Sequence, residues 1–303
     1  MRIAIIPNLT RKHAYEVTKN VCDFLSENGV EYFFEDNLEG QIGFDCRFMS
    51  SDELLGSCDI VIAVGGDGSI IHAAKKACKY NKPILGVNAG NLAFMAGLEK
   101  NEIPLIKNLI SGNYVTDNRM LLEVSVFDKD GNSIVREDFC VNDIAIARGE
   151  PIKMVKLNVA CDGNRINEYY ADGIIISTPT GSTAYSMAAG GPVVSPDNYC
   201  VVATPICPHS LINRSIVFSP DKTLDISVVN DRNNNAYLSI DGKESIPVDE
   251  ETKITISKSR YSAPTTSPAL APPGLQQSIY LGRPVSSLSA LSTFTSARSP
   301  CFL

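Results

Sequence analysis

The chain has 303 residues, enough for two domains that each have a core of their own. Its formal net charge is -7 and no run of Lys or Arg occurs, which argues against a nucleic-acid-binding surface and favours a small-molecule partner. The nine cysteines form no CxxC pair, no signal peptide precedes them, and no segment is apolar for long enough to cross a membrane, so we expect a cytoplasmic protein.

The first third of the chain alternates short apolar strands with amphipathic helices. The pattern predicts strands at 2–6, 31–34, 59–64 and 83–87 and helices at 14–28 and 70–80. Because this alternation is typical of a parallel sheet, we predict a Rossmann-like α/β domain with a mainly parallel sheet over residues 1–112.

The periodicity changes near Met120. Apolar alternation predicts strands at 121–127, 133–142, 144–147, 156–161, 173–177, 216–218, 224–229 and 236–240, and Asp-Lys-Asp-Gly at 128–131 predicts a hairpin turn. Many short strands with few helices indicate an all-β-rich domain over 113–264, with the boundary within 111–118. Residues 265–303 are rich in Ser and Pro and nearly free of charge, so we predict an irregular tail there.

A glycine-rich turn, Gly65-Gly66-Asp67-Gly68-Ser69, lies between a predicted strand and a predicted helix. Glycine frees backbone amides to face an anion at a helix N-terminus, so Gly65, Gly66, Gly68 and Ser69 are candidate phosphate ligands. The spacing matches neither a Walker A loop nor GxGxxG. Asp67 beside a phosphate is either a general base, with Mg²⁺ offsetting the charge, or simply the cap of the helix.

Two further stretches suit a nucleotide. Residues 171–191 place a hydroxyl- and glycine-rich loop after an apolar strand, which offers many donors and little bulk; the alternative is a capped turn, and we predict a helix at 183–189 with Ser182 or Thr183 as N-cap. Asn142 and Asp143 begin another strand, where an amide can pair with an adenine edge and a carboxylate can accept from ribose hydroxyls. An Asn-Asp pair also occurs simply as a turn.

These three stretches, in this order, resemble the NAD kinase family. Residues 65–68 are similar to its GGDG motif, Asn142-Asp143 to its Asn-Glu/Asp motif, and Thr178-Pro-Thr-Gly-Ser-Thr-Ala-Tyr-Ser to its second-domain signature. GGDG is shared with lipid kinases and phosphofructokinases, whereas the stretch 172–191 is far more specific. The resemblance covers about residues 1–264. It implies transfer of the ATP γ-phosphate to the adenosine-ribose 2′-hydroxyl of NAD, at a site between an α/β domain and a β-rich domain.

The resemblance also implies roles for individual residues. Asp67 is the expected proton acceptor, Asn142 and Asp143 hold the adenine and ribose, and Asp172 reaches the nicotinamide end. The implied NAD-binding residues are Asp67, Gly68, His72, Asn142, Asp143, Lys153, Asp172, Thr183, Ala184, Tyr185, Ser186, Met187 and Ala188. Mg²⁺ or another divalent cation is expected to arrive with ATP, without direct protein ligands. Polyphosphate is an open alternative donor, and a homodimer or homotetramer is the expected assembly.

The sequence departs from the family after Pro264, where a further strand and a charged helix are expected to return to the first domain. Residues 265–303 show neither pattern, which indicates an altered reading frame or a divergent tail. Two other functions therefore stay open: a non-catalytic dinucleotide-binding protein, and a kinase for a lipid or sugar. The four carboxylates Asp67, Asp143, Asp172 and Asp241 also have the alternative of being unrelated surface acids.

Overall fold

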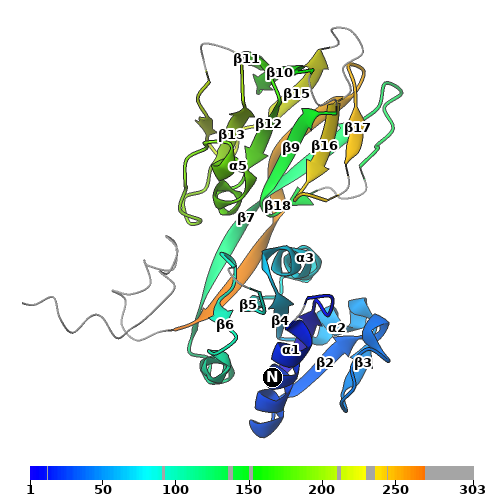
Figure 1. The fold of residues 1–303 in the computed structure, drawn as a ribbon, viewed down its shortest axis with the longest axis vertical. Coiled ribbons are helices and arrows are strands. Elements are labelled where there is room, and N and C mark those ends of the chain that lie inside the picture. The colour runs from blue at the N-terminus through cyan, green and yellow to red at the C-terminus, as the bar shows by residue number, and fades with distance from the viewer. Residues whose placement is uncertain are drawn as a thin grey trace, which may run out of the picture. The chain divides into compact units, whose positions relative to one another are not determined.

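The computed structural model describes residues 1–11, 13–90, 93–135, 139–149, 153–209, 213–229, 236–243 and 245–269 (Figure 1). No helix in these ranges is both long and apolar enough to span a membrane.

The N-terminal part is built on a parallel sheet in the order β6-β5-β4-β1-β2-β3, and every neighbouring pair in it is parallel. The strands are β1 (Arg2–Pro7), β2 (Glu31–Glu35), β3 (Arg47–Met49), β4 (Ile60–Gly65), β5 (Ile84–Asn88) and β6 (Leu98–Glu99). The helices are α1 (Ala14–Glu27), α2 (Ser51–Ser57), α3 (Asp67–Ala77) and α4 (Ile106–Ile110), with 3₁₀ turns η1 (Asp36–Leu38), η2 (Cys78–Tyr80) and η3 (Ile103–Leu105).

Helices cover both faces of this sheet, as the alternation of side chains along β1 shows. Ile3 and Ile5 belong to a buried cluster with α1 and α4, whereas Ala4 and Ile6 belong to a second cluster with α2 and α3. The predicted α/β domain with a mainly parallel sheet is thus confirmed. The prediction missed β3 and α2, which are too short for a clear period.

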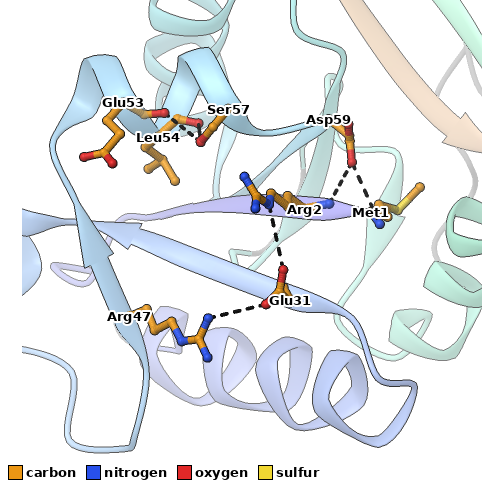
Figure 2. A network of polar contacts seen from close by, with 8 residues as sticks. All are labelled: Met1, Arg2, Glu31, Arg47, Glu53, Leu54, Ser57 and Asp59. Atoms are coloured by element: carbon orange, nitrogen blue, oxygen red, sulfur yellow. Dashed lines mark hydrogen bonds and ion pairs between the residues drawn. The ribbon is translucent and has the colours of Figure 1, made fainter.

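Ion pairs and a hydrogen bond link neighbouring strands of this sheet at the end where the strands begin (Figure 2). The backbone N–H of Arg2 donates to Asp59 at 2.7 Å, and the Arg2 side chain lies 3.8 Å from the Glu31 carboxylate. Arg47 reaches the same carboxylate at 3.4 Å. These side chains are largely exposed, so each pair contributes little to stability, on the order of 0–1 kcal/mol.

The second part is a sandwich of antiparallel strands. One layer has the order β14-β13-β12-β9-β16-β17, and the facing layer contains β11-β10-β15-β18 together with β7 and β8. The strands are β7 (Tyr114–Phe127), β8 (Phe139–Cys140), β9 (Asp143–Arg148), β10 (Val155–Cys161), β11 (Asn164–Ala171), β12 (Gly173–Ser177), β13 (Val201–Ile206), β14 (Ile216–Phe218), β15 (Leu224–Val229), β16 (Ala236–Ile240), β17 (Ile246–Val248) and β18 (Lys253–Pro268). One buried cluster takes side chains from both layers, so the predicted β-rich second part is confirmed.

Two long strands connect the two parts of the fold. β7 and β18 pair along most of their length, and Thr265 in β18 also pairs in parallel with Ile84 in β5 (Figure 1). A single sheet therefore runs from the sandwich into the parallel sheet. Helix α3 packs against this continuous sheet, because Ala263 of β18 belongs to the same buried cluster as Ala73 and Ala74 of α3.

The expectation that the returning strand is missing after Pro264 is wrong. β18 continues to Pro268, and the hydroxyl of Thr266 donates to the backbone oxygen of Ile84 at 3.2 Å. The pattern was missed because Pro264 and Pro268 argue against a strand, whereas here β7 and β5 pair with the backbone on both sides. The rest of the predicted tail, 270–303, lies outside the described residues. Of the predicted strand 133–142, β8 and a single bridge from Ser133 to Phe127 are described.

Candidate active site

The glycine-rich turn joins the end of β4 to the start of α3. Gly66 is the N-cap residue, and no side chain caps the helix. The Asp67 carboxylate instead accepts hydrogen bonds from the backbone N–H groups of Phe94, at 3.1 Å, and Met95, at 2.9 Å. The alternative that Asp67 merely caps its helix is therefore wrong. Its carboxylate is half-buried and oriented by the loop that follows β5.

The glycine at the end of β4 makes room for a neighbouring side chain. A Cβ on Gly65 would lie 2.4 Å from Oγ of Ser69, which in turn accepts a hydrogen bond from Nδ2 of Asn8 at 2.9 Å. Gly68 is exposed, with nothing within 4 Å of the position that a Cβ would take. Backbone amides at the start of a helix lack partners within it, so this end of α3 suits an anion. Asn8, which the sequence analysis missed, supports the turn from the end of β1.

The turn with Asn142 and Asp143 packs against the loop that follows β12. Thr178 donates from its backbone N–H to the oxygen of Asn142, at 2.9 Å, and from its hydroxyl to the oxygen of Val141, at 2.6 Å. A Cβ on Gly181 would lie 2.0 Å from that same Asn142 oxygen, so only glycine permits this approach. Two of the three predicted motifs are therefore in direct contact.

Two buried carboxylates lie at this contact. Asp143 is 5% exposed and the Asp241 side chain is 0% exposed, so the alternative of unrelated surface acids is wrong for both. Burial, and then the negative charge of Asp241, raise the pKa of Asp143 from 3.8 to about 7, although a hydrogen bond from the backbone N–H of Tyr185 opposes this. Asp143 therefore changes its charge near neutral pH.

The glycine-rich turn at residues 65–69 is connected to this contact by α3. Val141 and Phe139 share a buried cluster with Ala73, Ala74 and Ala77 of the helix that begins at Asp67. Lys75 of the same helix lies 3.3 Å from Asp241. One rigid helix thus joins the Asp67 turn to the Asn142-Asp143 turn.

The loop after β12 forms η4 (Thr180–Thr183) and then α5 (Tyr185–Ala188). The prediction that Ser182 or Thr183 caps this helix is wrong, because the N-cap is Ala184. The Ser182 hydroxyl instead bonds Pro179 and Val194, at 2.7 and 2.9 Å, and so closes the loop on itself.

The predicted nucleotide-binding residues of this loop differ in exposure. Tyr185, Met187 and Ala188 are exposed, and Thr183 and Ala184 are half-buried. Ser186 is fully buried, and its hydroxyl lies 3.0 Å from the hydroxyl of Thr204. Ser186 therefore supports the loop from inside, whereas its neighbours face outward.

Two buried hydroxyls were missed. Among the described residues, those of Ser177 and Thr180 have no hydrogen-bond partner within the protein. Buried hydroxyls are normally hydrogen-bonded, so both side chains have hydrogen-bonding capacity that the protein itself does not use.

The remaining predicted residues lie further from this contact. Asp172 forms an ion pair with Arg148, with Oδ1 2.8 Å from Nε, between the ends of β11 and β12. Lys153 is exposed just before β10. His72 is exposed on α3. It lies close enough to Glu35 to contribute to the lowered pKa of that carboxyl, so His72 is on the side of α3 toward β2 and α2. Among the described residues, no group of three or more His, Cys, Asp or Glu side chains is arranged to hold a metal ion.

Comparison with known proteins identifies the family. The model of the ATP-NAD kinase N-terminal domain matches residues 3–114, and that of the ATP-NAD kinase C-terminal domain matches residues 141–267. The NAD kinase of Caldanaerobacter subterraneus subsp. tengcongensis is 36% identical over 259 residues, 85% of this chain and 90% of its own length.

Two solved structures are similar in fold. An NAD kinase from Archaeoglobus fulgidus in complex with ATP has a TM-score of 0.69 and 25% identity, over 89% of this chain and 94% of its own. Yeast NADH kinase complexed with NADH has a TM-score of 0.79 and 24% identity, over 89% of this chain and 84% of its own. The family models, the relative and the geometry of the three motifs agree, and the chain belongs to the ATP-NAD kinase family.

Proposed function

We propose that this chain is an ATP-dependent NAD kinase, which transfers the γ-phosphate of ATP to the 2′-hydroxyl of the adenosine ribose of NAD and yields NADP. Membership of the family supports the reaction. The observation that carries the site is the single helix α3, whose first residue is the candidate base and whose buried face packs against Val141, the residue before Asn142 and Asp143.

Asp67 is the proposed proton acceptor. Two backbone amides fix its orientation, and a carboxylate has further lone pairs with which to accept the proton of an attacking hydroxyl. The neighbouring amides at the start of α3 and the open space beside Gly68 suit the transferred phosphate, close to the ribose. In phosphoryl transfer most of the acceleration comes from such positioning and charge stabilisation, so a prearranged turn is what the reaction requires.

The Asn142-Asp143 turn and the loop 177–188 are the proposed adenosine site. Asn142 offers an amide and Asp143 a carboxyl, and Tyr185 and Met187 are exposed on α5 in the adjoining loop. Asp172, oriented by Arg148, is the proposed contact for the nicotinamide end. His72 and Lys153 are two further proposed NAD-binding residues.

Mg²⁺, or another divalent cation, would reach the site on the phosphates of ATP and offset their charge. We further propose a cytoplasmic homodimer or homotetramer. The eight described cysteines, all free, support a reducing compartment. Light scattering on the purified chain measures the assembly.

The function is tested by a panel of phosphate acceptors. The purified chain is given MgATP with NAD, NADH, diacylglycerol or fructose 6-phosphate, and the products are separated by mass. We expect phosphorylation of NAD, and an NADP-specific dehydrogenase should accept the product. Phosphorylation of the lipid or sugar alone would refute the proposal. NAD binding without any product would indicate a non-catalytic binding protein instead.

A further inference from the structure

Lys75 is a buried cation with a buried partner. It lies two turns after Asp67 on α3, its side chain is 6% exposed, and its Nζ lies 3.3 Å from Oδ2 of Asp241, whose side chain is 0% exposed. The same Nζ lies 5.4 Å from the centre of the Phe139 ring. Residues 75 and 241 therefore join α3 to the second part of the fold.

The Asp241 carboxylate organises the turn that carries the proposed adenosine ligands. Oδ1 accepts from the backbone N–H of Asn142 at 2.7 Å, and Oδ2 accepts from that of Val141 at 3.1 Å. The N–H of Asp143 lies 3.4 Å from Oδ1, and the N–H of Asp241 donates to the Asp143 oxygen at 2.9 Å. One side chain thus binds three consecutive amides and fixes the backbone from which the Asn142 and Asp143 side chains project.

Charge makes this arrangement depend on Lys75. Asp241 and Asp143 are two buried carboxyl groups close enough to interact, and among the described residues Lys75 is the cation shown in contact with Asp241. Removing one partner of a buried ion pair leaves the other charge uncompensated, which is strongly destabilising to that local arrangement. Without the ammonium group, the three amides would therefore lose a well-ordered acceptor.

We propose that Lys75 is a positioning residue for NAD: through Asp241 it holds Asn142 and Asp143 in a fixed place relative to Asp67, which begins the same helix. The proposal rests on the proposed function, since Asn142 and Asp143 must be NAD ligands for the arrangement to affect turnover. The C-terminal end of α3 would then position NAD, the phosphate acceptor, while the N-terminal end provides the base.

Three variants and one control test the proposal. Lys75→Met removes the charge and keeps most of the stem, Asp241→Asn removes the other charge, and a double variant combines them. Asn suits position 241 because its φ is 51°, in the left-handed region that Asn tolerates. Lys76→Met is the matched control, because Lys76 is the next residue of α3 and forms its own ion pair, with Glu35 at 2.8 Å, near β2 and α2.

Amide hydrogen exchange without ligand is the first readout, because it does not depend on catalysis. We expect Lys75→Met to accelerate exchange at residues 141–143, and Lys76→Met to leave these amides unchanged. Unchanged exchange at 141–143 in folded Lys75→Met would overturn the proposal, even if the wild type made no NADP and the proposed function had failed.

Binding and turnover are the second readout. We expect Lys75→Met to raise the KM and the calorimetric Kd for NAD about tenfold while the KM for ATP changes less than about twofold. The double variant should recover part of this loss, since no charge is then left unpaired. Equal losses for NAD and ATP, or an equal loss in Lys76→Met, would contradict positioning and indicate a general effect on stability. If Lys75→Met does not fold, Asp241→Asn decides alone, and an unchanged NAD affinity there would overturn the proposal.

Discussion

The raised pKa of Asp143 predicts a specific dependence of stability on pH. An acid whose pKa is higher in the folded chain than in the unfolded chain favours folding below its unfolded value, and this contribution is lost as pH rises through the folded value. For Asp143 these values are 3.8 and about 7. Linkage then gives a loss of roughly 2–3 kcal/mol in the free energy of unfolding between about pH 5 and about pH 8.

Asp143→Asn should remove this loss, because Asn carries no charge and can still accept the hydrogen bond from Tyr185. The assay is urea denaturation followed by circular dichroism, since the chain has no tryptophan to report fluorescence. The variant should gain stability relative to the wild type as pH rises from about 5 to about 8. The same pH dependence of stability in both proteins would show that Asp143 does not have a raised pKa in the folded chain.

Glu35→Gln provides a control of opposite sign. Burial alone would raise the pKa of Glu35, but hydrogen bonds from Lys76 and Ser51 outweigh it and lower the pKa. A lowered pKa stabilises the fold above the unfolded value, and this stabilisation is lost as pH falls through the folded value. The wild type should therefore be more stable than Glu35→Gln at neutral pH, with a difference that shrinks in acid.

Two further substitutions test the loop contacts and the nicotinamide end. Gly181→Ala places a Cβ 2.0 Å from the Asn142 oxygen, so it should cost about 1–3 kcal/mol of stability and raise the KM for NAD, whereas Gly56→Ala, on α2 with nothing within 4 Å, should be neutral or stabilising. An unchanged KM in Gly181→Ala would count against the contact. Asp172→Asn breaks the ion pair with Arg148 and should weaken NAD binding by calorimetry, whereas Asp162→Asn, which breaks an exposed pair with Lys222, should not. Equal affinities would remove Asp172 from the site.

Local patterns in the sequence were enough to predict the α/β part and most strands of the second part. Apolar runs such as 60–65 and 173–177 are buried on both faces. Such runs indicate buried strands when Gly or Pro residues follow closely. Strands whose pattern is mixed, such as β11, were missed. β18 was not predicted as a strand, and its C-terminal residues are held by pairing with β5 and β7.

The candidate site was predictable as motifs but not as an arrangement. Asp67, Asn142 and the loop 178–186 stand out by residue type, whereas the partners that orient them are far away in sequence. Lys75 gives no signal of its own on an amphipathic helix, and its partner lies 166 positions later in the numbering. For Asp241 the available signal was the Asp-Gly turn after an apolar strand, which fits its positive φ. Serine is a common N-cap residue, so Ser182 was one of two predicted caps. Its hydroxyl instead accepts a hydrogen bond from the backbone N–H of Val194.

The role of Asp67 in NAD phosphorylation is decided by the rate of NADP formation by the purified chain and by Asp67→Asn, each with its NAD affinity determined by calorimetry. We expect the wild type to form NADP from NAD and MgATP. We expect Asp67→Asn to retain NAD binding and to lose about 10²- to 10⁴-fold in turnover, the usual contribution of a general base. Undiminished turnover in Asp67→Asn would exclude Asp67 as the base, and no NADP from a wild type that binds both substrates would exclude the kinase.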